Sequence, residues 1–125
     1  MATVDLSRFL EVHDDHERAL DELRAGRKRT HWMWYVFPQA AGLGQSSMSR
    51  RYAITSIDEA LAYLTHPVLG PGYVELVDEV WHQVVELGVR VHDLFGSPDD
   101  AKLVSSLTLF AEIGRRLGDG SEHLV

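Results

Sequence analysis

Hydrophobic residues recur at steps of three and four along most of the chain, which is the spacing that places them on one face of a helix. The first such segment predicts a helix over residues 6–23, with Asp5 as its cap and Gly26 just past its end. The apolar positions of this segment are Leu6, Phe9, Leu10, Leu20 and Leu23.

A second apolar stripe predicts a helix over residues 73–85, which Gly88 closes. We expect the stripe to be buried in the core or in a contact between subunits. It consists of Tyr73, Leu76, Val77, Val80, Trp81, Val84 and Val85. Residues 89–95 are ambiguous, and a single helical turn around 92–95 is favoured over a strand.

Capping residues mark two further helix starts. Ser56 and Glu59 form a capping box, so a helix is expected from here until Pro67 stops it. Further along, Ser97 is expected to be the N-cap and Pro98 the first helical residue. This last helix is predicted to end near Gly118, and the residues that it turns inward are Leu103, Leu107, Phe110 and Ile113.

Residues 27–53 lack this periodicity, because prolines, glycines and a serine cluster interrupt it. Within them, residues 32–37 form either a short helix or an extended piece. No alternating run supports a sheet. The chain is therefore predicted to be all-α, a single compact helical domain of about five to six helices over residues 1–125, with a frayed or truncated tail from about residue 118.

Composition narrows the class of protein. A chain of 125 residues that is 45% hydrophobic suffices for one core. Its formal net charge of -7 argues against a nucleic-acid partner, since proteins that bind a phosphate backbone gain their affinity from clustered Lys and Arg side chains. No segment approaches the ~20 apolar residues that span a bilayer, no charged leader precedes an apolar run, and no cysteine is present. We expect a cytoplasmic protein without nucleic-acid or membrane partners, and a homo-oligomer is compatible with the sequence.

Cations, indoles, an imidazole, an amide and hydroxyls concentrate in residues 27–52. Aromatic faces beside cationic and amide donors suit a flat, polar or anionic ligand. The start of the last helix is expected to face the same pocket, because helix N-termini favour anions. The candidate ligand-binding residues are Lys28, His31, Trp32, Trp34, Gln39, Ser46, Ser49, Tyr52, Lys102 and Ser105.

Each part of this candidate site has a structural alternative. The aromatic segment can be packed, with its donors bonded to backbone carbonyls. Residues 42–49 can form an anion nest, or only a turn followed by a capped helical turn, and they do not match a Walker loop. Asp99 can simply offset the dipole of the last helix and pair with Lys102.

Catalytic and metal chemistry have few candidates. No serine lies in a Gly-x-Ser-x-Gly motif, so covalent hydrolysis is disfavoured, and His31 and Asp99 are the acid–base candidates. His13 and His16 share a helix face and invite a metal interpretation. Because no third ligand is identifiable from the sequence, we expect a partly buried, hydrogen-bonded histidine pair, with no metal and no cofactor.

Several motifs together resemble a bacterial family, the domain of unknown function 1810. They are Arg27-Lys-Arg-Thr-His-Trp-Met-Trp-Tyr-Val-Phe-Pro-Gln39, Gly42-Leu-Gly44, Ser46-x-x-Ser-x-x-Tyr-Ala-Ile54, His66-Pro-Val-Leu-Gly70 and Phe95-Gly-Ser-Pro-Asp-Asp-x-Lys102. The resemblance implies one all-helical domain, as in a mycobacterial relative, and places the candidate residues and Asp99 within shared motifs. It implies no activity: the label calpastatin, which some members carry, has no visible basis in this chain. It also implies that members usually continue for a few helical turns beyond the Thr108-Leu-Phe110 motif, toward a terminus that contains Gly and Pro.

Three functions remain open at this point. The first is a pocket that binds a nucleotide-like or anionic small ligand. The second is a metal-independent enzyme that acts on such a ligand, for example by hydrolysing an N-glycosidic bond of an ADP-ribose-type compound. The third is a homo-oligomeric interaction module in which Trp32, Trp34 and Tyr35 form the interface, because aromatic residues are common in binding hot spots.

Overall fold

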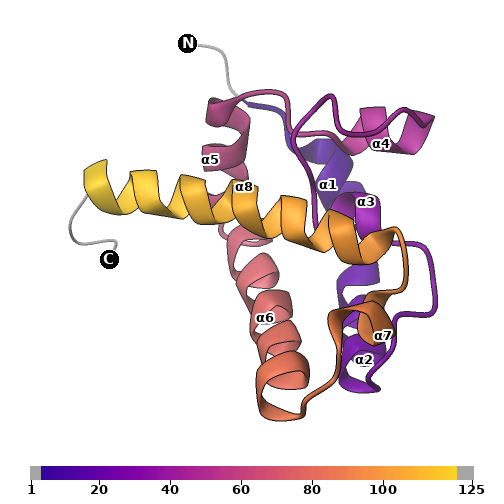
Figure 1. Ribbon diagram of the computed structural model, residues 1–125. Helices are drawn as coiled ribbons and strands as arrows, with labels where there is room; N and C mark the ends of the chain where they lie inside the picture. Colours follow the sequence, from indigo (N-terminus) through magenta and orange to yellow (C-terminus); the bar gives the residue numbers. More distant parts are fainter. Residues whose placement is uncertain (1–3, 121–125) are drawn as a thin grey trace.

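The computed structural model describes residues 4–120, and α-helices form its regular structure (Figure 1). They are α1 (Ser7–Glu11), α2 (Asp15–Arg24), α3 (Met33–Val36), α4 (Ser47–Tyr52), α5 (Ile57–Thr65), α6 (Leu69–Trp81), α7 (Val91–Phe95) and α8 (Asp99–Gly120). The all-α prediction is confirmed, although these helices outnumber the five to six expected. The predicted frayed tail is helical as far as Gly120, and residues 121–125 lie outside the described part of the chain.

The helix predicted over residues 6–23 is two helices, because the chain turns between α1 and α2. Residues 13–16 are all polar, so no apolar position continues the hydrophobic stripe from α1 into α2. The turn is closed by short-range bonds, such as the His16 N–H donating to the carbonyl of His13 at 3.0 Å. Asp5 does accept an N–H of the first turn, that of Ser7, at 2.9 Å.

Of the two capped helix starts, that of α5 is found where it was expected. The Ser56 hydroxyl accepts the N–H of Glu59 at 3.0 Å, and the Glu59 carboxylate accepts the N–H of Thr55 at 3.0 Å. At α8 the prediction was wrong by one residue. Pro98 takes the N-cap position instead of the first helical position, since its carbonyl already accepts the N–H of Lys102 at 3.2 Å.

Helix α6 begins at Leu69, four residues before the predicted start. A proline is tolerated in the first turn of a helix, and a glycine in this turn allows α6 to approach α5 closely. A Cβ atom at Gly70 would lie 2.1 Å from the carbonyl oxygen of Leu64, so this glycine lets α6 begin directly against α5. At its other end α6 loosens into a π-helical turn, His82–Glu86. The wider turn buries Gln83, whose amide donates to the carbonyl of Arg24 at 3.3 Å.

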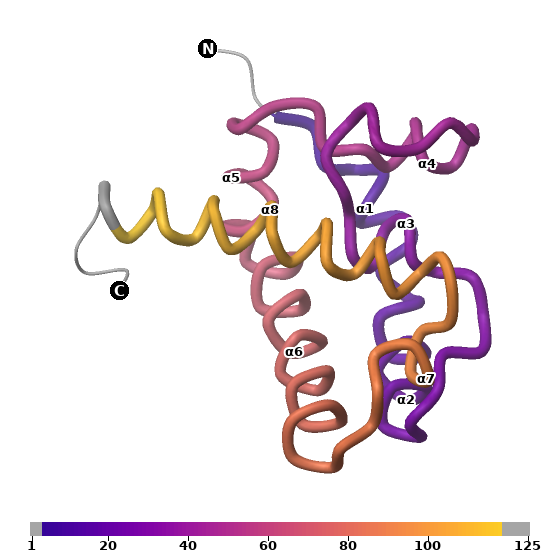
Figure 2. Tube along the Cα trace, viewed as in Figure 1, coloured from indigo at the N-terminus to yellow at the C-terminus, as the bar shows by residue number. Residues whose placement is uncertain are grey.

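The core contains residues of most of the helices, and one part of it lies between α8 and the helices α5 and α6, which α8 crosses (Figure 2). Tyr73 of α6 contacts Phe110 of α8 with ring centroids 4.7 Å apart, and its hydroxyl bonds the buried hydroxyl of Ser106 at 2.9 Å. Three of the residues predicted to face inward from α8 are buried, namely Leu103, Phe110 and Ile113. Of the 73–85 stripe, Trp81 and Val85 are exposed on this chain. Within the described residues, no helix has the length and apolar content that a membrane span requires.

Candidate functional site

A cavity of about 410 Å³ opens between the segment of residues 39–55 and the first turns of α8. Six of the candidate residues line it: Trp34, Gln39, Ser49, Tyr52, Lys102 and Ser105. The remaining wall comes from Gly42–Gly44, from small side chains and from Arg50, Thr55 and Pro98. The sequence prediction that the irregular loop and the start of the last helix meet therefore corresponds to a real hollow.

The loop side of the cavity is held by backbone contacts. The carbonyl of Gln39 accepts the N–H of Ile54 at 2.8 Å, and the N–H of Ala41 donates to Ile54 at 2.8 Å, which joins the two ends of the segment. Between these ends, Gly42 takes a φ of +93°, a conformation that L side chains rarely adopt. A Cβ atom at Gly44 would lie 2.5 Å from the hydroxyl of Ser49, so the glycine loop lies directly against α4.

Ser46 lies outside this lining and has a structural role at the start of α4. Its hydroxyl accepts the N–H of Ser49 at 3.0 Å and contacts the Ser49 hydroxyl at 2.9 Å. The alternative interpretation of residues 42–49, a glycine turn followed by a serine-capped helical turn, describes this local structure. Ser46 thus positions Ser49 at the edge of the cavity.

The opposite wall is the first turns of α8. Lys102 places its ammonium 5.6 Å from the ring centroid of Trp34 and 3.7 Å from the carboxylate of Asp99. Ser105 follows one turn later on the same face and also lines the cavity. Trp34, which is partly buried, therefore presents an aromatic surface beside a cation.

The charge of the lining is of one sign. Arg50 and Lys102 are its charged residues, and no carboxylate is among the described residues that line the cavity. Arg50 makes no ion pair with any residue between 4 and 120. A locally positive cavity in a chain of formal charge -7 favours an anionic occupant over a cationic one.

Lys28 and Trp32 lie away from the cavity lining, each tied to an internal partner. The Lys28 ammonium is buried, 2.9 Å from the carboxylate of Asp99, and donates to the carbonyl of Thr30 at 2.5 Å. Trp32 is fully buried. It therefore offers no surface to a ligand, nor to the protein interface that the third hypothesis assigned to it.

The partner of the donor-rich loop is Glu22 on α2, a residue that sequence reasoning missed. Its carboxylate accepts the N–H groups of Arg29 and Thr30 at 2.6 and 2.9 Å, the Thr30 hydroxyl at 2.6 Å and the Trp32 indole at 3.1 Å. Partial burial raises the pKa of Glu22, but these hydrogen bonds outweigh it and lower the pKa from 4.5 to about 2. The one available signal was the concentration of donors, which requires an acceptor nearby.

The two acid–base candidates are not brought together at the cavity. His31 is exposed and does not belong to the lining. Asp99 lies between Lys28 and Lys102 and likewise does not belong to the lining. The cavity thus offers binding groups, while its described lining contains neither a carboxylate nor an imidazole for proton transfer.

Known proteins are similar to this chain in family and in fold. The family described as "Protein of unknown function (DUF1810)" matches residues 3–120. The crystal structure of a conserved hypothetical protein from Mycobacterium tuberculosis is similar, with 47% sequence identity and a TM-score of 0.82. That match covers 97% of this chain and 82% of the mycobacterial chain. The search of curated proteins found no match.

Proposed function

The chain belongs to the family of proteins of unknown function DUF1810, and we propose that it binds a small anionic ligand with a planar part, of the nucleotide class, in the cavity beside α8. The observation that carries the proposal is the charge of the lining, whose two charged residues, Arg50 and Lys102, are both cationic. Any acceptor-rich anionic group that enters is attracted by both, in a molecule that is otherwise acidic.

The size and the chemistry of the walls agree with such a ligand. A volume of about 410 Å³ lies in the range of small-molecule sites, roughly 300–1,000 Å³. The guanidinium of Arg50 suits phosphate or carboxylate oxygens, and the hydroxyls of Ser49, Thr55 and Ser105 supply further donors. The rings of Trp34 and Tyr52 supply the apolar area on which a flat group can rest.

Titration calorimetry and thermal shift with AMP, ATP, ADP-ribose and inorganic phosphate test the proposal. A ligand present at about 100 times its Kd stabilises the fold by about 2.7 kcal/mol, which raises the melting temperature measurably. If the planar part matters, at least one nucleotide binds more tightly than phosphate does. No melting shift and no heat with any of the four compounds, in a folded sample, would contradict the proposal.

Neighbouring arginines provide a matched pair of variants. Arg50→Gln removes a lining cation and should weaken binding by roughly tenfold or more, because charge-assisted hydrogen bonds are worth about 1.5–3 kcal/mol. Arg51→Gln removes an equal charge that lies outside the lining and pairs with Glu11 at 3.5 Å, so it should leave affinity nearly unchanged. Equal losses in both variants would mean that only the overall charge matters.

A further inference from the structure

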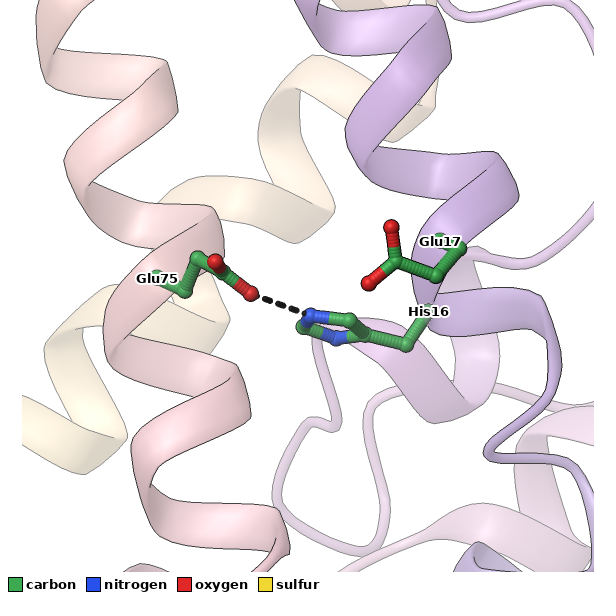
Figure 3. Close-up of side chains that lie close together, drawn as sticks. All are labelled: His16, Glu17 and Glu75. Carbon is green, nitrogen blue, oxygen red and sulfur yellow. Dashed lines mark hydrogen bonds and ion pairs between the residues drawn. The ribbon is translucent and has the colours of Figure 1, made fainter.

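A second group of polar side chains lies far from the cavity lining, between α2 and α6. His16 and Glu17 are consecutive on α2, and Glu75 is on α6 (Figure 3). His16 projects across the space between the helices toward Glu75, while the carboxylate of Glu17 reaches toward the same space from beside the imidazole. The three residues come together only through the packing of α2 against α6.

The spacing of these groups is that of a ligand set. His16 Nε2 lies 2.7 Å from Glu75 Oε1. One ligand atom from each of the three residues can be chosen so that all lie within 4.8 Å of one another. Metal–ligand bonds of about 2 Å place the ligands of one ion roughly 3–3.5 Å apart, so small rotations of the two carboxylates suffice to close the site.

The imidazole is held in place while the carboxylates are free to adjust. The side chain of His16 is 10% exposed, and its ring stacks on that of His13 with centroids 5.1 Å apart. Gly72 of α6 makes room for this pair, since a Cβ atom there would lie 3.3 Å from atoms of both rings. The Glu75 side chain, in contrast, is 51% exposed.

Charge provides the reason to expect a cation. Two carboxylates, those of Glu17 and Glu75, lie beside one imidazole, and Glu17 has no hydrogen bond or ion pair with any residue between 4 and 120. The nearest basic residue on the same helix, Arg18, pairs with Asp15 instead. An ion pair between His16 and Glu75 alone would account for one carboxylate and leave the second beside it unmatched.

We propose that His16, Glu17 and Glu75 form a binding site for a divalent transition-metal ion of the Zn²⁺ type, which bridges α2 and α6. Imidazole nitrogen disfavours Mg²⁺ and Ca²⁺, which prefer oxygen ligands throughout, whereas mixed nitrogen and carboxylate sets bind Zn²⁺. Three protein ligands leave one position of a tetrahedral ion for water. No metal was expected from the sequence, because His13 and His16 had no identifiable third ligand. The proposed set keeps His16 and adds Glu17 and, from α6, Glu75, which lies 59 residues from His16.

Calorimetric titration of the purified, metal-stripped protein with Zn²⁺ is the direct test. The expected result is saturable binding of one ion per chain and a rise in melting temperature, because the ion binds only when α2 and α6 are packed together. Titration with Co²⁺ should give the visible absorption of a coordinated ion. The absence of saturable Zn²⁺ binding at one equivalent would overturn the proposal.

Variants distinguish this site from chance binding at surface histidines. Glu75→Gln and Glu17→Gln should each weaken Zn²⁺ binding by at least about tenfold, since even the outer partners of metal ligands are worth this much. Both positions are exposed, so the fold is retained. His16→Asn should abolish binding, and circular dichroism checks its fold.

The matched control is His82→Asn. His82 also pairs with a glutamate, Glu86 at 3.2 Å, but this pair lies within one exposed helical stretch and forms no three-residue group within residues 4–120. Zn²⁺ affinity should therefore be unchanged in His82→Asn. Equal Zn²⁺ affinity in Glu75→Gln and in the natural sequence, or a loss in His82→Asn as large as in Glu75→Gln, would overturn the assignment.

Discussion

Glu22 shows how much a single residue decides in this fold. The donors of residues 29–32 that make the loop look like a binding surface converge instead on one carboxylate. Buried donors are nearly always paired, so the donors indicate either a ligand or an internal acceptor, and here the acceptor is part of the chain. The proposed ligand site therefore consists of residues that Glu22 does not engage, such as Trp34 and Lys102.

Glu22→Gln should destabilise the protein, because an amide replaces one strong acceptor oxygen by a donor that faces other donors. We expect a loss of about 1–2 kcal/mol in the free energy of unfolding, the lower part of the range for charged hydrogen bonds, since solvent partly screens the site. Urea unfolding at pH 7 measures it. An unchanged midpoint would mean that the loop does not depend on this carboxylate.

The same residue predicts a pH dependence. Its pKa is lowered from 4.5 to about 2 in the folded protein, so its contribution to stability is fully present above pH 4.5 and is lost as the pH falls toward 2. Unfolding free energies measured from pH 6 down to pH 2.5 should therefore fall less steeply in Glu22→Gln than in the natural sequence. Parallel curves would contradict the assigned shift.

Among the elements, the loop and α8 are joined by the buried contact of Lys28 with Asp99. The Lys28 side chain is 6% exposed and its ammonium also lies 4.9 Å from the ring centroid of Trp32. This contact fixes the first turn of α8 relative to the loop, and so fixes where Lys102 and Ser105 stand in the cavity wall. Lys28, one of the candidate ligand-binding residues, thus lies outside the lining of this cavity and positions α8 beside it.

Lys28→Met should cost about 2–3 kcal/mol, because it removes the buried partner of Asp99 and leaves that carboxylate with only Lys102, 3.7 Å away. The double variant Lys28→Met/Asp99→Asn should recover part of this loss. Arg90→Met breaks a fully exposed pair with Asp93 and should have little effect on the urea midpoint. A double variant less stable than Lys28→Met would show that the pair does not act as a unit.

The start of α6 depends on close contact with α5, and glycine makes that contact possible. Gly70→Ala should lower the free energy of unfolding by about 2 kcal/mol or more, because the added methyl meets the backbone carbonyl of Leu64 at 2.1 Å. Gly114→Ala in α8 is the control, since no atom outside the local helix backbone lies within 4 Å of its Cβ position. There alanine should stabilise by up to about 1 kcal/mol through helix propensity. The two melting temperatures should therefore move in opposite directions.

At the scale of the whole molecule, α8 is the element that crosses the rest, and only part of it is packed. Its last buried described residue is Ile113, and the helix continues past α5 and α6 beyond that point (Figure 1). Local opening is easiest where few apolar contacts must be broken. Amides of residues 114–118 should exchange with solvent deuterium faster than those of residues 103–113. Equal protection along α8 would mean that something covers its outer turns.

The family assignment and the all-α class were both accessible from the sequence. Periodicity and capping depend on residues close in the chain, so the starts of α5 and α8 were found to within one residue. The glycines at 26 and 88 end their helices with positive φ for the same local reason. The prediction of helix boundaries failed at two places where no capping or periodic signal marked them, between α1 and α2 and at the π turn after α6.

What the sequence determined by itself was the all-α class, the helices that periodicity and capping mark, and that the loop of residues 27–53 and the start of α8 carry unusual chemistry. Only the tertiary structure decided which of those side chains face a cavity and which are paired inside the fold. The physical reason is that a donor finds its acceptor through space. Nothing in the sequence singled out Glu22 or Glu75, or joined Asp99 to Lys28, and the packing of the chain brings each of these acids to its partner.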